Sequence, residues 1–234
     1  MALIGLRVGP FEIVDHLTLP EAGSWYLARR VGTSQRHPNE VFVNLLPPDA
    51  EPDEREDLVW QHENLDALDD PRIPKAIALY EGTGALVVSA MHGHSLAAVM
   101  ATQEDHRLPL SQATLVDLGI ELSEVLQHAH HRDRLHGHLH AGNVHVGARG
   151  ELQVWGFSLG SKALPPVEWM PPERGRGRRA TAATDQWSLG ALLAALYTGK
   201  PPWPAASPPR LAFSFPAPIT LFEEVAKFRA ARRI

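Results

Sequence analysis

Short strand-like stretches mark the first third of the chain. Phe11 and Ile13 alternate with polar neighbours, as in a half-buried β-strand, whereas residues 25–27 and 41–43 are short apolar runs, the last one rich in β-branched and aromatic side chains. Two further apolar runs, 76–80 and 85–91, flank a glycine-containing turn and predict a hairpin. Together these stretches predict an antiparallel sheet of about five strands.

One amphipathic helix interrupts the predicted strands. Its apolar residues Leu58, Leu65 and Leu68 recur at helical spacing, and Pro71 ends the pattern because proline cannot continue a helix. The first third of the chain therefore reads as a strand-rich region that contains a single helix.

After residue 95 the hydrophobic spacing becomes mainly helical. Ser111 is suited to cap a long helix whose apolar residues run over 115–126, and a second apolar helix is predicted over residues 185–197. Two short strand-like pieces, at 144–146 and 152–155, lie between these helices. A strand-rich half therefore precedes a helix-rich half.

Composition narrows the class of protein. The chain has 234 residues, of which 44% are hydrophobic, so it can bury the core of one large domain or two small ones. The absence of cysteine excludes a disulfide scaffold and a cysteine nucleophile, and no apolar run reaches the roughly 20 residues of a membrane helix. The N-terminus lacks the order of a signal peptide, and the net charge is −5. We therefore expect a cytoplasmic protein that binds neither membrane nor nucleic acid.

Several short motifs follow one another in the helical half. Residues 136–143 read His-Gly-His-Leu-His-Ala-Gly-Asn, residues 170–173 read Met-Pro-Pro-Glu, and residues 185–190 read Asp-Gln-Trp-Ser-Leu-Gly. They are similar to a catalytic loop of the form H-R-D-L-x-x-x-N, the A-P-E end of an activation segment, and helix F. With the order of elements, they resemble the eukaryotic-like (Hanks-type) Ser/Thr protein kinase family, most closely its bacterial branch.

The resemblance covers roughly residues 9–203 and implies an α+β, bilobal protein-kinase-like fold. We expect residues 1–92 to form an N-lobe with a five-stranded antiparallel sheet and one helix, and residues 93–234 to form a mainly helical C-lobe. The two lobes make one kinase-like domain. The residues after 203 are too few for the closing helices of the family, so we expect the last C-lobe helices to be lacking.

The residues that the resemblance assigns to phosphate binding are replaced. Phosphoryl transfer depends on positioning and on neutralising charge, so a kinase needs particular charged groups. The strand lysine of the family is Asn44 here, and Gln61 takes the place of the helix glutamate that would pair with it. The positions of the Gly-rich loop hold Thr18, Pro20 and Gly23, so one glycine of three remains. Neither the lysine nor the glutamate of the family's ion pair is therefore present.

The catalytic loop and the following strand are changed as well. In the register that places Asn143 at the metal-binding asparagine, the catalytic aspartate becomes His138. Residues 131–133 also read His-Arg-Asp, but this run does not match the catalytic-loop motif. The motif needs an asparagine five positions after its aspartate, and His138 stands there instead. We expect this run to lie where the preceding helix ends. Gly156 stands where the magnesium-binding aspartate of D-F-G would lie. Asn143 alone remains of the polar catalytic set.

Three substitutions bear on the nucleotide pocket. By the resemblance, Trp25 and Phe42 replace small residues that contact the adenine from above, and His145 replaces the leucine below it. If the backbone path is kept, both rings project into the adenine volume and bury apolar area without a ligand. The alternative is that the rings turn outward or that the strands shift by one residue, which exchanges the faces of a strand.

Residues with an architectural role in the family are retained. The resemblance assigns Leu65, Ala76, His136 and Phe157 to a spine of side chains through both lobes. It assigns Asp185 to the helix that anchors the backbone of the catalytic loop. We therefore expect the fold to be kept although the catalytic groups are replaced.

Two clusters of one residue type remain. The histidine-rich stretch at 128–145 lacks the i, i+4 pairs of metal-binding helices, so we expect no metal site there. Four arginines directly follow the segment that would dock a substrate, and they are candidates for binding an acidic protein partner: Arg174, Arg176, Arg178 and Arg179. A plain solvated loop is the alternative interpretation of this run.

These substitutions predict a pseudokinase that binds no ATP and no other cofactor. Its function would be binding, as a protein-interaction scaffold or an allosteric partner of an active kinase or another signalling protein. The bias toward arginine over lysine favours a bacterial setting. Two alternatives stay open: a kinase-fold enzyme of altered chemistry, with His138 as general base, and a module that binds a nucleotide or metabolite without turnover.

Overall fold

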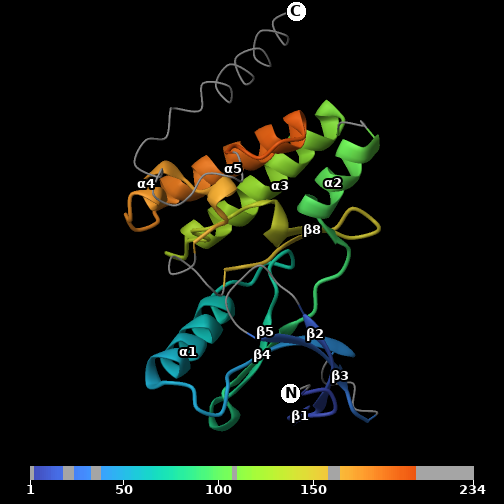
Figure 1. Ribbon diagram of the computed structural model, residues 1–234, viewed down its shortest axis with the longest axis vertical. Coiled ribbons are helices and arrows are strands. Elements are labelled where there is room, and N and C mark those ends of the chain that lie inside the picture. The colour runs from blue at the N-terminus through green and yellow to red at the C-terminus, as the bar shows by residue number, and fades with distance from the viewer. Residues whose placement is uncertain (1–2, 18–23, 33–37, 107–109, 158–163, 204–234) are drawn as a thin grey trace, which may run out of the picture.

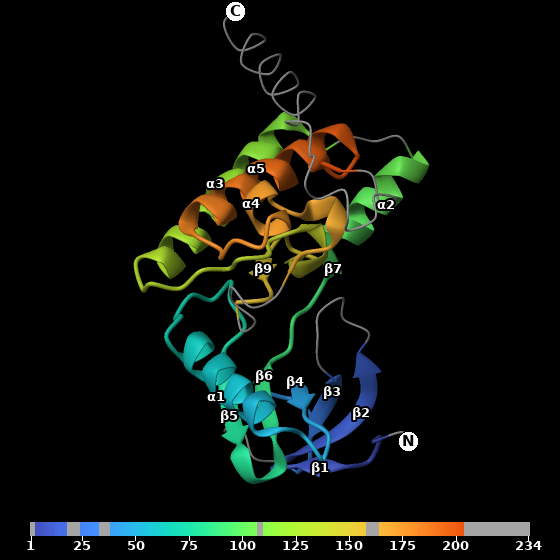
Figure 2. The same ribbon diagram turned by 60° about the vertical axis from the view of Figure 1, so that its left-hand side comes forward.

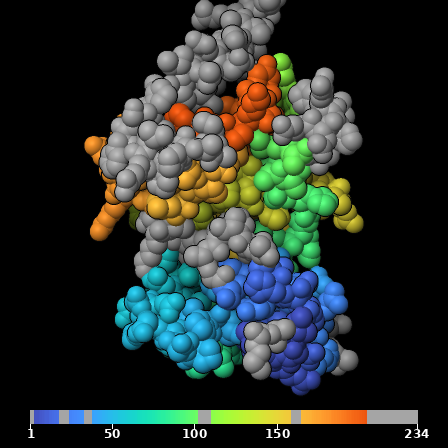
Figure 3. Space-filling view, viewed as in Figure 1, coloured from blue at the N-terminus to red at the C-terminus, as the bar shows by residue number. Residues whose placement is uncertain are grey.

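The computed structural model describes residues 3–17, 24–32, 38–106, 110–157 and 164–203. In these residues a strand-rich lobe lies at one end of the molecule and a helix-rich lobe at the other (Figures 1 and 2). The space-filling view shows the same division, with the blue to cyan residues gathered below the green to orange ones (Figure 3). The expected α+β bilobal fold is confirmed.

The N-lobe is built on one antiparallel sheet of six strands, in the order β1-β2-β3-β4-β6-β5. The expectation of five strands was one too few, because β1 has only two residues and so gives no alternating pattern. The turn before β2 contains Gly9, whose φ is +55°. The bounds of the strands are β1 Arg7–Val8, β2 Phe11–Leu17, β3 Trp25–Arg30, β4 Glu40–Leu45, β5 Ala76–Tyr80 and β6 Ala85–Ser89.

The two faces of this sheet bury different cores. Val41 and Val43 of β4 pack into a cluster that lies entirely within the N-lobe, together with Phe11 and Ile13 of β2. Phe42 points the other way and packs against a larger cluster that includes residues of both lobes. The alternation of strand side chains therefore turns one face of β4 toward the rest of the molecule.

Helix α1 (Pro52–Asp66) packs beside β5 and β6, as the spacing of Leu58 and Leu65 predicts. The helix begins with Pro52 at its first position, where the missing N–H costs nothing. The Glu54 carboxylate accepts the backbone N–H of Glu51 at 2.9 Å. This arrangement satisfies one of the free donors at the helix start.

The C-lobe is mainly helical. Ser111 caps α3 as predicted, because its hydroxyl oxygen accepts the N–H of Thr114 at 3.1 Å. A separate helix, α2, precedes α3 and was not predicted, since its sequence has no clear apolar stripe. The bounds of the helices are α2 Leu96–His106, α3 Gln112–His130, α4 Pro172–Gly175 and α5 Ala182–Thr198.

A small sheet lies between the lobes, in the order β7-β8-β9 (Figure 2). The two predicted strand pieces form its β8 (Val144–Val146) and β9 (Leu152–Val154), and β7 (His94–Ser95) completes it. Within the described ranges, no helix combines the length and the apolar character that crossing a membrane requires.

Arg72 joins the two lobes through polar contacts. Its guanidinium donates to both oxygens of Asp70, at 3.0 and 2.8 Å, and to Glu124 of α3 at 2.8 Å. Its carbonyl oxygen accepts the N–H of Val154 at 2.7 Å. Arg72 thus connects the loop after α1 with a helix and a strand of the C-lobe.

Candidate functional site

The loop that resembles a catalytic loop is anchored by Asp185, at the start of α5. One carboxylate oxygen of this fully buried residue accepts the Gly137 N–H at 2.7 Å. The other oxygen accepts the His136 N–H at 2.9 Å and lies 2.8 Å from His130 Nε2. Burial by itself raises the pKa of Asp185, but the hydrogen bonds from His130, Gly137 and His136 outweigh it and lower that pKa. The geometry therefore gives Asp185 the anchoring role that the sequence predicted.

His136 lies in the spine position that the resemblance implies. Its ring is fully buried and packs edge-on against Phe157, with ring centroids 4.8 Å apart. Its Nε2–H donates to the Trp155 carbonyl at 2.8 Å, because a carbonyl oxygen can only accept. Burial, with a further contribution from nearby His138, lowers the pKa of His136 to about 3. The ring is therefore neutral at pH 7.

His138, which the resemblance assigns to the position of the catalytic aspartate, points inward. Its side chain is 1% exposed, and its Nδ1 donates to the His136 carbonyl at 3.0 Å. The other ring nitrogen faces Gly156: a Cβ added to that glycine would lie 2.8 Å from His138 Nε2. The imidazole therefore fills the space in which a side chain at position 156 would begin.

Gly156 also has a backbone conformation that favours glycine, with φ of +108°. An aspartate at this position would meet both an unfavourable backbone and the rings of His138 and His136. Positions 138 and 156 are thus in contact in space, although 17 residues separate them in the sequence.

Asn143, which the resemblance assigns to the metal-binding asparagine, binds the loop itself. Its Nδ2 donates to the His138 carbonyl at 3.0 Å, and its Oδ1 accepts the His140 N–H at 2.9 Å. The residue is fully buried. Its amide therefore holds the loop together and is engaged at both ends.

Asn44 and Gln61 meet, as their assignment to the lysine and glutamate positions implies. Asn44 Nδ2, on β4, donates to Gln61 Oε1, on α1, at 3.2 Å. Asn44 is buried and Gln61 half-buried. A neutral hydrogen bond therefore stands where the resemblance implies an ion pair.

The rings of Trp25 and Phe42 meet a third ring from the C-lobe. Trp25 is 0% exposed and packs edge-on against Trp155, with ring centroids 4.6 Å apart. Phe42 lies 5.9 Å from the same indole. Trp25 pairs with Asn44 in the β3–β4 register, so its side chain shares the face of Asn44 and Phe42. In this register, both rings face the C-lobe.

Sequence reasoning missed Trp155, which completes this aromatic cluster of Trp25, Phe42 and Trp155. The residue directly precedes Gly156, and its N–H donates to the Asn143 carbonyl at 2.7 Å. The sequence offered one signal for this contact: a large aromatic residue stands one position before the expected D-F-G aspartate. Its contact with β3 depends on the packing of the lobes, which no local pattern encodes.

His145 is half-buried on β8, where it pairs with Ser95 and Gln153 in the small sheet. Burial lowers its pKa. The positions assigned to the Gly-rich loop, Thr18, Pro20 and Gly23, lie outside the described residues, as do residues 204–234, where closing helices were expected to be lacking.

The residues at the expected magnesium positions do not fit that ion. Mg²⁺ takes oxygen ligands, chiefly carboxylates. Gly156 has no side chain, and both amide atoms of Asn143 are bound to backbone. Among the described residues, no group of three or more His, Asp or Glu side chains is placed to hold a metal ion.

Arg174 does not belong to an exposed basic patch, which corrects the expectation from its sequence run. It is 8% exposed, and its guanidinium donates to the Arg178 carbonyl at 3.0 Å. The buried turn of α4 takes this side chain inward, where it holds the following loop. Arg176, Arg178 and Arg179 are exposed. The candidate partner surface is therefore these three arginines.

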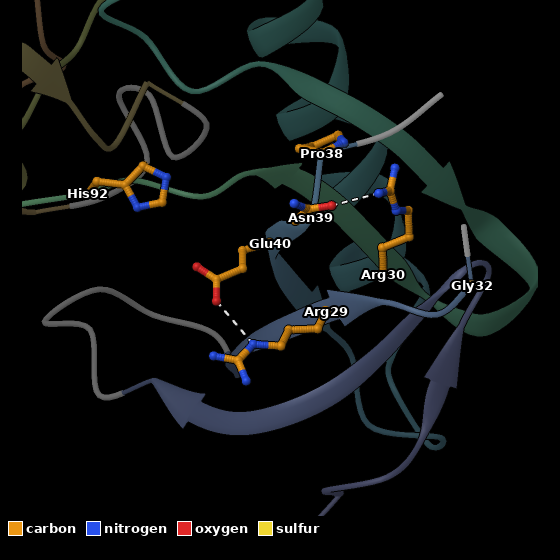
Figure 4. A pocket seen from close by; sticks show the side chains of 7 residues that line it. All are labelled: Arg29, Arg30, Gly32, Pro38, Asn39, Glu40 and His92. Carbon is orange, nitrogen blue, oxygen red and sulfur yellow. Dashed lines mark hydrogen bonds and ion pairs between the residues drawn. The ribbon is translucent and has the colours of Figure 1, made fainter. Parts of the chain in front are cut away.

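A separate polar cavity of about 480 Å³ lies on the N-lobe beside β3 and β4 (Figure 4). Arg29 binds Glu40 across the two strands at 3.0 Å, and Arg30 donates to Asn39 at 2.6 Å. Both guanidinium groups therefore have acceptors within the cavity wall, and this cavity does not include the catalytic-loop positions.

Comparison with known proteins agrees with this architecture. The family model described as "Protein tyrosine and serine/threonine kinase" matches residues 12–216. Among curated proteins, the chain is 24% identical over 226 residues to serine/threonine-protein kinase PknB of Mycobacterium leprae, covering 87% of this chain and 35% of that protein. It is 23% identical over 212 residues to serine/threonine-protein kinase CLA4 of Candida albicans, covering 82% of this chain and 20% of that protein. The chain thus spans about a third or less of these relatives.

Solved structures show the same fold. One crystal structure of the Mycobacterium tuberculosis PknI kinase domain matches with a TM-score of 0.71 and 19% identity, covering 97% of this chain and 87% of that one. A second crystal structure of the same kinase domain matches with a TM-score of 0.67 and 20% identity, covering 89% and 80%. With a family match over most of its length, the chain belongs to the protein tyrosine and serine/threonine kinase family.

Proposed function

We propose that this kinase-family domain is catalytically inactive and acts by binding other proteins. The observation that carries the proposal is the coupled replacement at His138 and Gly156. The catalytic aspartate position holds a buried imidazole, and that ring lies where the metal-binding side chain would begin. Phosphoryl transfer needs charge neutralisation at both positions.

The second support is the loss of charge on the N-lobe side of the cleft. Asn44 and Gln61 share one neutral hydrogen bond, and neither side chain supplies a charge for a phosphate. We infer that ATP with magnesium gains no strong electrostatic contact here. No cofactor is part of the proposed function.

The third support is the aromatic cluster. Trp25 is buried against Trp155 without any ligand, and Phe42 packs beside them. For adenine to enter between the lobes, these rings would have to separate, which costs on the order of 1.5–3 kcal/mol for each large apolar side chain exposed. We therefore infer a cleft that is filled by the protein itself.

An enzyme that uses His138 as general base is the rival function. A general base must reach the proton that it removes, within about 3 Å or through one water. His138 is 1% exposed, and its Nδ1 is bound to the His136 carbonyl. This burial favours a packing role for His138 over a catalytic one.

The binding role rests on the loop between α4 and α5. Arg176, Arg178 and Arg179 are exposed on it within four residues, and Arg174 holds the loop from inside. A concentrated positive charge on a protein of net charge −5 suits an acidic segment of a protein partner, such as another signalling protein. Because the chain has no cysteine and its relatives include bacterial kinases, we place this partnership in a bacterial cytoplasm.

A thermal-shift titration tests the inactive cleft. With about 5 mM ATP and MgCl₂, we expect the melting temperature to move by less than about 1 °C, while an active protein kinase in the same plate rises by several degrees. A rise of several degrees in this protein would overturn the filled-cleft proposal.

A transfer assay with γ-labelled ATP tests the rival. We expect no label on the protein or on a general substrate above the level of His138→Ala. Label that is transferred by the natural protein and lost in His138→Ala would establish the enzyme in place of the binding module.

A binding assay tests the partner surface. We expect the triple variant Arg176→Ala, Arg178→Ala, Arg179→Ala to lose at least about tenfold in affinity for partners recovered from native cells, with a salt dependence that the variant lacks. Arg29→Ala, exposed on the other lobe, is the matched control. Equal binding by the triple variant and the control would exclude the basic loop as the contact.

A further inference from the structure

Two buried polar atoms lie on the face of the N-lobe sheet that is turned toward the C-lobe. Trp25 is 0% exposed, yet no group in the described part of the chain accepts a hydrogen bond from its Nε1–H. Asn44 is 3% exposed, and no described residue donates to its Oδ1. Buried polar groups in folded proteins are nearly always hydrogen-bonded, because burial removes the water that would otherwise bind them. One buried donor and one buried acceptor therefore point to a further bound group.

The two residues are direct neighbours across the strands. Trp25 of β3 and Asn44 of β4 are partners in the strand register. Side chains of such partners stand on the same face of a sheet, with their Cβ atoms about 5 Å apart. Asn44 Nδ2 donates to Gln61 Oε1 at 3.2 Å, so Oδ1 lies on the other side of the amide group from that bond. One small molecule can therefore reach both the indole N–H and the amide oxygen.

The side chains around this pair supply no oxygen acceptor to the indole. Trp155 packs edge-on against Trp25, with ring centroids 4.6 Å apart, and Phe42 lies 5.9 Å from Trp155. An indole nitrogen only donates, so the rings of Trp155 and Phe42 offer nothing but their π-faces. Trp203 shows the ordinary arrangement elsewhere in the chain, since its Nε1–H donates to the Met170 carbonyl at 2.9 Å.

The chemistry of the two atoms selects the bound group. It must accept a hydrogen bond from the Trp25 N–H and donate one to the Asn44 oxygen. A carboxylate only accepts and an ammonium only donates, and either would lose its hydration here without a counter-ion. A water molecule does both, and it is small enough for a site inside a packed aromatic cluster.

We propose that one water molecule is bound between Trp25 Nε1 and Asn44 Oδ1 as a structural component of the fold. Through this water and the bond from Asn44 to Gln61, one chain of hydrogen bonds connects β3, β4 and α1. The water site does not depend on the proposed inactivity, because its test involves no nucleotide and no phosphate transfer. It gives Asn44 a second role, beside its bond to Gln61.

Nuclear magnetic resonance of the full chain with ¹⁵N-labelled tryptophan tests the site. The chain has six tryptophans, and the indole signal that is missing from Trp25→Phe belongs to Trp25. We expect a nuclear Overhauser cross-peak between this Nε1–H and a long-lived water, although the side chain is fully buried. Absence of this cross-peak would overturn the proposal. An upfield indole proton would then assign the donor to the π-face of Trp155, and a cross-peak to the chain itself would assign it to a protein acceptor.

Two variants identify the acceptor. Asn44→Leu and Gln61→Leu both remove the hydrogen bond between these two side chains, but only Asn44→Leu removes Oδ1. We expect the water cross-peak of Trp25 to weaken at least about tenfold in Asn44→Leu and to stay in Gln61→Leu. Equal cross-peaks in the two variants, whether kept or lost, would overturn the bridge. A high-resolution crystal structure of the natural chain is an independent check, since it should show water density within hydrogen-bonding distance of both atoms, and density near neither atom would also overturn the proposal.

Discussion

The imidazole of His138 lies over the α-carbon of Gly156, with Nε2 placed 2.8 Å from the position of a Cβ on that glycine. The resemblance assigns these two residues to the positions of the two aspartates on which phosphoryl transfer depends, and their replacement is part of the proposed inactivity. The imidazole of His138 thus occupies the space that is left because Gly156 has no side chain. A change at either position has to be considered together with the other.

We expect Gly156→Ala to destabilise the protein through two separate effects. The positive φ costs an L-residue roughly 1–2 kcal/mol, and the contact with His138 adds about 1–3 kcal/mol of overpacking. Gly150→Ala is the matched control, since Gly150 has φ of +87° but no atom near its Cβ position. Urea denaturation should show a clearly larger loss for Gly156→Ala, and equal losses would contradict the contact with His138.

We expect position 44 to accept a lysine only when position 61 becomes acidic. Asn44→Lys puts a charge into a buried site without a counter-ion, which costs about 3 kcal/mol or more. Adding Gln61→Glu supplies the carboxylate at the distance where Gln61 Oε1 now accepts, and we expect it to recover at least about 1 kcal/mol. A double-mutant cycle from urea unfolding measures this coupling. A coupling of zero would show that the two side chains do not meet.

Stability should fall below neutral pH because buried histidines resist protonation. Burial, followed by the proximity of His138, lowers the pKa of both His136 and His140 from 6.5 to about 3. Between these two pH values the unfolded chain binds protons that the folded chain excludes. The free energy of unfolding is therefore unaffected by these two groups above pH 6.5 and falls by up to about 2.7 kcal/mol per pH unit as the pH drops toward 3.

Two variants separate this effect from other titrating groups. His140→Asn removes one of the two histidines, so the slope of stability against pH should drop by up to about 1.4 kcal/mol per pH unit at the acid end of the range. Ile4→Asn, at a position that is 60% exposed, adds an asparagine on the surface without removing a titratable group and should leave the slope unchanged. The slope, taken from urea unfolding between about pH 5 and 7.5, is the quantity to compare, because either variant can shift the absolute stability.

We expect Arg72→Lys to weaken the connection between the lobes by about 1–2 kcal/mol. A lysine cannot bind Asp70 through two nitrogens and reach Glu124 at the same time. Lys75→Ala is the control, because Lys75 and Asp69 are both exposed and their pair is 3.8 Å long. Thermal unfolding of the two variants gives the comparison, and a loss in Lys75→Ala as large as that in Arg72→Lys would contradict a special role for Arg72.

Motif spacing predicted the polar contacts of the site because they join positions that the family fixes in sequence. It placed Asp185 under the loop and matched Asn44 with Gln61, and the structure brings each of these sets together. Hydrophobic periodicity likewise predicted α1, α3 and α5.

Contacts that depend on three-dimensional packing could not be predicted in this way. Whether a run of arginines is exposed depends on how its first turn packs, and Arg174 turned inward. The meeting of Trp155 with Trp25 depends on how one lobe is seated on the other. Strand β1 is too short to show alternation, and α2 has too little apolar asymmetry to show a stripe.

The larger hydrophobic cluster includes Trp25 and Leu58 of the N-lobe together with Leu122 and Leu192 of the C-lobe. The lobes are distinct in shape, yet they share one core, so neither can lose its packing without exposing part of the other. Denaturation should consequently follow a single cooperative transition, seen alike by circular dichroism and by intrinsic tryptophan emission. A ligand bound to either lobe would then raise the midpoint of the whole domain.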